Sequence, residues 1–128
     1  MRVAGIGFRA AAPLASLAAA LAEVEARGGR AEALATLAAK AGADALQALA
    51  RARGLPVLAL PDLAGIDTPT LSPRVQARFG TGSLAEAAAL AGAGPGAHLT
   101  VARIATPDGM ATAAMAEAPS PRPIGDIA

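Results

Sequence analysis

The sequence contains no cysteine, tryptophan or tyrosine, and it has only two phenylalanines, one lysine and one histidine among 128 residues. Without cysteine the chain has no disulfide, no thiolate zinc site and no thiol nucleophile. The scarcity of aromatic side chains argues against a protein that stacks single-stranded bases. A formal net charge of +1 gives no bulk basic field for holding a polyanion. We therefore expect no nucleic-acid partner.

Long apolar runs are missing as well. No uncharged apolar stretch approaches the roughly 18 residues of a membrane-spanning helix. The first residues already follow the pattern of a folded strand, so we read no secretory leader. We expect a soluble cytoplasmic protein of one domain, with no membrane partner. Hydrophobic residues make up 54% of the chain, but many are alanine, which predicts a core of small side chains.

Strand and helix patterns alternate in the first half. An apolar run over 2–8 predicts a buried strand, and the helical leucine spacing after Pro13 predicts a helix that ends at Gly28 and Gly29. Residues 32–36 form a second candidate strand, for which alanine content leaves a helix as the alternative. A helix over 44–53 and a strand over 55–60 follow. This order predicts a βαβαβ unit around a parallel sheet.

The second half predicts two helices and then two strands. Ser72 and Pro73 have the form of a helix cap and first helical residue, and a further helix begins at Ser83. Strands over 99–105 and 110–117 flank a turn that contains Pro-Asp-Gly. We therefore expect an α/β fold, with residues 1–118 forming a single three-layer domain. Its sheet is largely parallel, a hairpin-like strand pair lies at the C-terminal end, and residues 119–128 form a flexible tail.

The first glycine segment, Gly-Ile-Gly-Phe-Arg-Ala, fits the G-x-G-x-x-G/A fingerprint of dinucleotide-binding proteins. That fingerprint requires an acidic residue about 20 residues later, at the end of the second strand. Ala35 and Thr36 stand at that place instead. We favour a turn at Gly5 and Gly7 that needs small residues for close backbone approach, and keep a nucleotide site as the alternative.

The second glycine segment, Gly-Thr-Gly-Ser-Leu-Ala-Glu, begins a helix. Ser83 and Glu86 fit a capping box, in which the serine accepts a backbone N–H and the glutamate reaches back. Gly80, Thr81 and Gly82 place backbone N–H groups at the helix N-terminus, where the macrodipole favours an anion. No Gly-Lys-Ser/Thr follows, so this is not a Walker loop. We predict a capped helix whose turn also receives a carboxylate or phosphate.

Three cations lie far apart in the sequence. Arg9 follows the first strand and Lys40 the second, just past the carboxyl ends where open α/β sheets bind ligands. Arg103 lies in the penultimate strand. With the glycine turns, these cations suit a small ligand that carries several carboxylates. Lys40, the only lysine, is also a candidate for a Schiff base or a general base, with a solvated lysine as the alternative.

Signals for other chemistry are weak. The single histidine, His98, has no defined orienting partner, which argues against a catalytic triad with Ser83. Asp62 and Asp67 share one loop, but nothing else supports a pair of acid–base carboxylates. Metal-ligand spacing is absent, and we expect neither a metal nor a cofactor.

Three ordered blocks resemble the cobalamin-biosynthesis family formed by CobE and the C-terminal domain of CbiG. Residues 5–9 are similar to Gly-Ile-Gly-Cys-Arg, and residues 34–40 to Leu-Ala-Thr/Ser-Ile-Asp-x-Lys. Residues 80–90 agree almost throughout with Gly-Thr-Gly-Ser-Val-x-Glu-x-Ala-Ala-Leu. The chain departs from these patterns at Phe8, where cysteine is usual, and at Ala38, where an acid is usual. The likeness runs over nearly the whole chain, and without a counterpart of the CbiG N-terminal domain we expect the stand-alone CobE form.

The resemblance implies a cytoplasmic protein of aerobic corrin-ring construction. We expect it to bind a polycarboxylate tetrapyrrole, either a precorrin or a corrinoid like hydrogenobyrinic acid, as a carrier or accessory protein. Other enzymes of the pathway are further candidate partners. The alternative is a precorrin-processing hydrolase or isomerase related to cobalt-precorrin-5A hydrolase, with Lys40 or Glu86 in acid–base roles. The candidate ligand contacts are Gly5, Gly7, Arg9, Thr36, Lys40, Gly80, Thr81, Gly82, Ser83 and Arg103.

Overall fold

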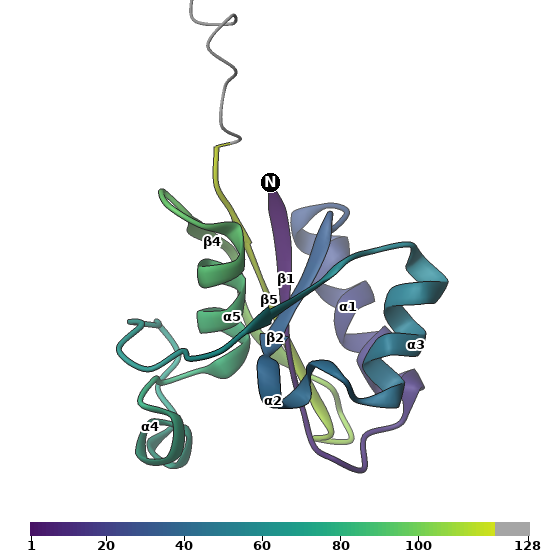
Figure 1. Ribbon diagram of the computed structural model, residues 1–128, viewed down its shortest axis with the longest axis horizontal. Helices are drawn as coiled ribbons and strands as arrows, with labels where there is room; N and C mark the ends of the chain where they lie inside the picture. The colour runs from purple at the N-terminus through teal and green to yellow at the C-terminus, as the bar shows by residue number, and fades with distance from the viewer. Residues whose placement is uncertain (120–128) are drawn as a thin grey trace, which may run out of the picture.

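The computed structural model describes residues 1–119, which fold around one five-stranded sheet (Figure 1). The strands are β1 (Arg2–Phe8), β2 (Ala33–Leu37), β3 (Val57–Leu60), β4 (His98–Ala105) and β5 (Ala111–Glu117). The helices are α1 (Leu14–Gly28), α2 (Ala38–Ala41), α3 (Asp44–Arg53), α4 (Pro73–Phe79) and α5 (Leu84–Ala93). All of the predicted tail except Pro119 lies outside the described residues.

The strand order is β3-β2-β1-β5-β4. Strands β1, β2 and β3 are parallel, as the βαβαβ pattern predicts, and the alanine-rich second segment is a strand rather than a helix. Strand β5 pairs antiparallel with β1 along its full length, from Arg2 opposite Glu117 to Phe8 opposite Ala111. The predicted α/β class is therefore confirmed, and the C-terminal strand pair extends the same sheet beyond β1.

Helices cover both faces of the sheet, which gives three layers (Figure 1). Because side chains alternate along a strand, β1 contributes to two separate apolar clusters. Ala4 and Ile6 pack with α1 and α3, whereas Val3 packs with the α5 alanines Ala87 and Ala88. Within residues 1–119, no helix is both long enough and apolar enough to span a membrane.

The contact between α5 and β1 is unusually close. A Cβ built on Gly5 would lie 1.9 Å from the Ala85 carbonyl oxygen and 2.6 Å from the Ala89 amide nitrogen. Both of these atoms belong to the α5 backbone, which cannot move aside as a flexible side chain can. Glycine at this position therefore lets the helix lie directly on the strand, which agrees with the predicted close approach. The predicted turn at Gly5 and Gly7 is wrong, because both residues lie inside strand β1 and pair with β5.

We predict that Gly5→Ala lowers the free energy of unfolding by about 3 kcal/mol or more, because the new methyl group overlaps helix backbone. Chemical denaturation followed by far-UV circular dichroism measures the change. Gly42→Ala is the matched control: Gly42 has a helical φ of −83° and open space around its Cβ position. Equal stability of the two variants would contradict the close packing of α5 on β1.

Candidate ligand-binding cleft

The carboxyl ends of the parallel strands and the start of α5 meet at one edge of the sheet. Arg9 directly follows β1, and Lys40 lies in the four-residue helix α2 that directly follows β2. The Ala85 amide nitrogen, in the first turn of α5, lies 4.0 Å from the position of a Cβ on Gly7. Helix α5 therefore begins above the end of β1, and its N-terminal turn borders the same space as Arg9.

Ser83 caps α5 as predicted, but the second half of the capping box is wrong. The Ser83 hydroxyl accepts a hydrogen bond from the Glu86 amide at 3.3 Å. The fully buried Glu86 carboxylate does not return to Ser83: it accepts from the Thr70 amide at 2.9 Å, the Thr70 hydroxyl at 3.0 Å and the Arg103 amide at 2.9 Å. Glu86 thus joins the loop before α4 to strand β4 and satisfies two backbone amides, those of Thr70 and Arg103.

Helix α4 forms a lobe beside the domain, attached through the second glycine segment (Figure 1). Gly80 ends α4 with a positive φ of 73°, and its carbonyl accepts from the Gly65 amide at 2.8 Å. The Thr81 hydroxyl donates to the Ile66 carbonyl at 2.6 Å. Ser72 caps α4 as predicted, its hydroxyl accepting from the Val75 amide at 3.5 Å. No residue of α4 is buried, so the helix is positioned by its two ends.

Between this lobe and the strand ends lies a cleft of two adjoining hollows, which we call the basic cleft. The inner hollow is bordered by Gly7, the start of α5, Arg103 and the β4–β5 turn. The outer hollow is bordered by α2 and the inward side of α4. The residues common to both hollows are Phe8, Arg9, Arg74, Val75 and Leu84.

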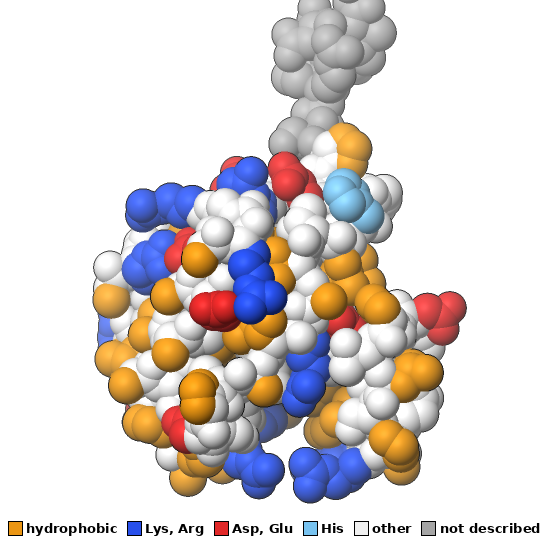
Figure 2. Space-filling model, turned by 180° about the vertical axis from the view of Figure 1, so that it is seen from behind, with side chains coloured by type: hydrophobic (Ala, Val, Ile, Leu, Met, Phe, Trp, Pro, Cys, Tyr) orange, Lys and Arg blue, Asp and Glu red, His pale blue; other side chains and the backbone are white. Residues whose placement is uncertain are grey.

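The lining of the basic cleft is strongly cationic. Five of the eleven lysine and arginine residues of the chain border it: Arg9, Lys40, Arg74, Arg78 and Arg103. Among the described residues, no aspartate or glutamate lines either hollow. Figure 2 shows lysine and arginine side chains on both sides of the gap between the main body and the smaller lobe. Like charges gathered around one hollow create a local positive potential that favours an anionic occupant.

Two of these cations were missed by the sequence interpretation. Arg74 and Arg78 are four residues apart on α4, a spacing that places both on one face of a helix. That spacing was visible in the sequence. The position of α4 opposite Arg9 and Lys40 was not, because it depends on the hydrogen bonds that join the loop at Thr70 to Glu86.

Lys40 lies deepest among the cations of the outer hollow. Its ammonium donates a hydrogen bond to the Phe8 carbonyl and lies 5.0 Å from the centroid of the Phe8 ring. Burial lowers the pKa of Lys40, and the nearby positive charge of Arg78 lowers this pKa further. An anion placed between Lys40 and Arg78 would remove that repulsion.

The inner hollow has a fixed wall at the β4–β5 turn. Arg9 donates from Nε to the Gly109 carbonyl at 3.1 Å. Asp108, beside it, accepts hydrogen bonds from the hydroxyls of Ser16 and Thr106, and these bonds, that of Ser16 first, lower the pKa of Asp108 to about 2. The turn is thereby tied to α1, so Arg9 is held against a backbone that is itself anchored.

The other candidate residues are placed away from the cleft lining. Among the predicted ligand contacts, Gly7, Arg9, Lys40, Gly82, Ser83 and Arg103 line one or both hollows, whereas Gly5, Thr36, Gly80 and Thr81 line neither. Thr36 is buried, and its hydroxyl donates to the Ile6 carbonyl at 2.9 Å.

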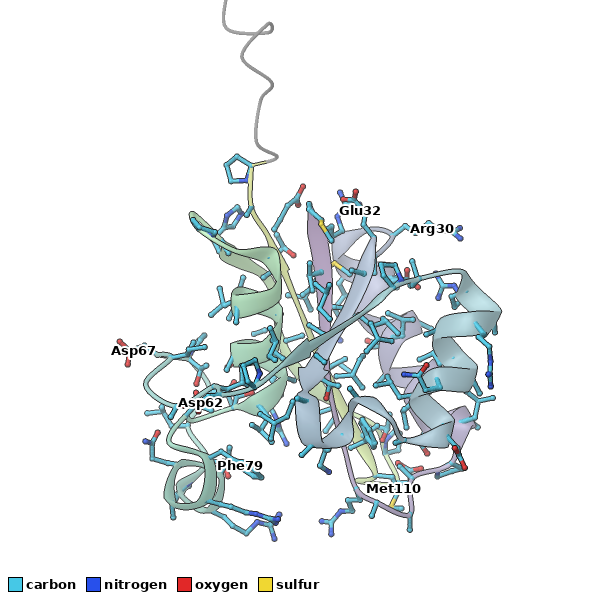
Figure 3. All side chains as sticks on the ribbon, in the orientation of Figure 1. Arg30, Glu32, Asp62, Asp67, Phe79 and Met110 are labelled. Atoms are coloured by element: carbon cyan, nitrogen blue, oxygen red, sulfur yellow. The ribbon has the colours of Figure 1, made fainter. Side chains whose placement is uncertain are left out.

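The residues considered for a catalytic triad or a carboxylate pair are also dispersed. His98 begins β4, at the opposite end of α5 from Ser83. Asp62 and Asp67 lie in the loop before α4 and line neither hollow, and Figure 3 shows Asp67 at the outer side of this loop. Within residues 1–119, no three His, Cys, Asp or Glu side chains are grouped closely enough to hold a metal ion.

Comparison with known proteins supports the resemblance carried by the three sequence blocks. The family described as "Cobalamin synthesis G C-terminus" (CbiG_C) matches residues 2–116. The crystal structure of CobE, a protein from the cobalamin (vitamin B12) biosynthetic pathway, is 30% identical and superposes with a TM-score of 0.79, covering 95% of this chain and 93% of that one. The cobalamin biosynthesis protein ChiG from Agrobacterium tumefaciens str. C58 is also 30% identical, with a TM-score of 0.71 and coverage of 94% and 100%. No curated protein matches the chain.

The proximity of Lys40 and Arg78 can be tested through the pKa of Lys40. We predict that Arg78→Gln raises this pKa toward its ordinary value of 10.5, because the repulsion from Arg78 is lost while burial remains. Because the chain has one lysine, reductive ¹³C-methylation yields a single lysine signal, which NMR follows as a function of pH.

Arg51→Gln serves as the control, because Arg51 lies on α3 and lines neither hollow. An unchanged Lys40 pKa in Arg78→Gln, or the same rise in both variants, would show that α4 does not hold Arg78 near Lys40.

Proposed function

The chain belongs to the CbiG C-terminal family of cobalamin biosynthesis, and from this premise we propose that it binds a polycarboxylate corrin intermediate in the basic cleft. The intermediate is a precorrin or a corrinoid such as hydrogenobyrinic acid, and the protein acts as a carrier or accessory factor of the aerobic route. We further propose the cytoplasm as the place of action, as the family resemblance implies, and other enzymes of the pathway as recipients of the ligand.

One observation carries the proposal: five cations border the cleft and, among the described residues, no carboxylate does. A site without acidic partners leaves its positive charges available to a ligand. Corrin precursors carry several acetate and propionate groups around a ring, so their negative charges are spread over a wide perimeter. Cations distributed from Lys40 on one side to Arg103 on the other match that spread better than they match a single phosphate.

The side-chain types also suit carboxylates. Four of the five cations are arginines, whose planar guanidinium can bind a carboxylate through two parallel hydrogen bonds. The turn at Gly82 and Ser83 lines the inner hollow together with Arg74 and Arg103. The protein groups would bind and orient the ligand without any covalent step.

The enzyme alternative rests on Lys40. Its lowered pKa and its place in the outer hollow are features of a general base. Glu86, the other acid–base candidate, is fully buried, its carboxylate accepts three hydrogen bonds, and it lines neither hollow. A precorrin hydrolase or isomerase therefore has at most one candidate acid–base group in the cleft, which favours the binding role.

We predict that hydrogenobyrinic acid forms a coloured stoichiometric complex that co-elutes with the protein in gel filtration. Arg9→Gln and Arg74→Gln should each weaken the affinity about fivefold, since a solvent-accessible charged contact contributes roughly 1 kcal/mol. Affinity should also fall as salt rises, because screening weakens the attraction. Absorbance titration measures the dissociation constants.

Arg51→Gln, outside the cleft, should leave the dissociation constant unchanged. If Arg51→Gln weakened the affinity as much as the cleft variants do, the ligand would bind elsewhere or would respond only to the net charge of the protein. Spectral turnover of a precorrin by catalytic amounts of protein, lost in Lys40→Gln, would establish the enzyme alternative and contradict the carrier role.

A further inference from the structure

Helix α4 presents an apolar stripe that the domain core does not cover. Val75 and Phe79 are four residues apart and therefore lie on one face of the helix. Both line the outer hollow, and neither is buried. An amphipathic helix ordinarily packs its apolar stripe against the core, whereas this stripe faces the cleft. Figure 3 shows Phe79 on the side of α4 toward the main body.

The aromatic content of the chain is concentrated at this cleft. The sequence has two phenylalanines and no tryptophan or tyrosine, and both phenylalanines line the outer hollow. Phe8 is almost fully buried at the end of β1 and lies beneath Lys40. Phe79, from a segment 71 positions later, keeps part of its ring exposed. It is therefore the aromatic face that a ligand can reach.

A basic stripe runs beside the apolar one. Arg74 and Arg78 line the same hollow, and the Arg78 guanidinium carbon lies 4.9 Å from the centroid of the Phe79 ring. A guanidinium stacks on aromatic faces, so Arg78 lies over one face of the Phe79 ring and places a positive charge beside its apolar surface. The opposite wall repeats the combination, with the apolar residues Ala39, Ala43 and Leu84 near Lys40 and Arg9.

We propose that Phe79, supported by Val75, is the contact that selects a flat macrocycle over a flexible acyclic polycarboxylate. The inference rests on the proposed function and specifies what the cleft recognises besides charge. The five cations alone would bind the carboxylates of a macrocycle and those of an acyclic ligand equally well. A broad apolar ring face additionally covers Phe79 and Val75 and removes their surface from water. The occupant is thus a planar polycarboxylate ring, with charge at its edge and apolar surface at its centre.

The test compares two macrocyclic probes with one acyclic probe in the same binding assay. The macrocyclic probes are hydrogenobyrinic acid and uroporphyrin, and the acyclic probe is octaglutamate, a flexible chain with many carboxylates. Phe79→Leu keeps an apolar side chain but removes the flat ring. It is expected to weaken binding of both macrocycles about tenfold, the order of a lost aromatic stacking contact, and to leave octaglutamate binding unchanged.

Two further variants separate ring recognition from charge and from folding. Arg74→Gln should weaken macrocyclic and acyclic probes to the same extent, because it removes charge alone. Leu14→Ala changes another apolar side chain, which is 41% exposed and lies outside the hollows. This variant should bind the macrocyclic and the acyclic probes as tightly as the unsubstituted protein does. Far-UV circular dichroism and melting temperatures establish that Phe79→Leu remains folded, which is expected because no residue of α4 is buried.

The outcomes distinguish the two proposals. If the unsubstituted protein binds neither macrocycle, the proposed function fails and the ring contact fails with it. If it binds the macrocycles and Phe79→Leu binds them as tightly, the proposed function stands and the role of Phe79 is overturned. Equal weakening of octaglutamate would also overturn it, since Phe79 would then shape the cleft for any anion. A change of oligomeric state in Phe79→Leu would instead identify the stripe as an interface between copies.

Discussion

The contact between α5 and β1 determines where the other parts of the cleft can lie. Because Gly5 has no side chain, the α5 backbone rests directly on the strand, and the helix begins above the end of β1. That start brings Gly82 and Ser83 to the inner hollow. One turn later, Glu86 reaches Thr70 and Arg103, which fixes both the loop before α4 and the neighbouring part of β4. A buried carboxyl group that accepts three hydrogen bonds is held firmly, since losing any of them would leave polar atoms unsatisfied in the interior.

The arrangement of charge follows from this packing. Cations from β1, α2, α4 and β4, which are distant in the sequence, border one cleft and repel one another across it. Burial lowers the pKa of Lys40 most, and the positive charge of Arg78 lowers this pKa further. This repulsion destabilises the protein when the cleft is empty, and a bound anion relieves it. The cleft is therefore organised for a negatively charged ligand. The partly exposed stripe of Val75 and Phe79 also favours a ligand with an apolar surface, which the cations alone would not select.

Local sequence signals predicted most elements, because each depends on nearby residues. The helical leucine spacing of α1, the caps Ser72 and Ser83, the stop at Gly54 and the turn before β5 all act within a few positions. The pairing of β5 with β4 was predicted, but the four-residue helix α2 and the pairing of β5 with β1 were not, since alanine-rich segments carry little pattern and distant strand neighbours are chosen by tertiary packing. The second half of the capping box was wrong for the same reason: Glu86 found stronger partners at Thr70 and Arg103, far away in sequence. Arg74 and Arg78 carried a visible helical spacing, but only the path of the loop places them opposite Lys40.

If a corrinoid occupies the cleft between α4 and the strand ends, its binding must alter the amides that line this cleft. Amide chemical-shift changes in ¹H–¹⁵N NMR spectra, followed during titration with hydrogenobyrinic acid, show where the ligand lies. We expect the largest changes at residues of the two hollows, with Arg9, Lys40, Phe79, Ser83 and Arg103 among them. Changes concentrated instead around Arg51 and Gly54, on the far end of α3, or spread evenly over the surface, would contradict it.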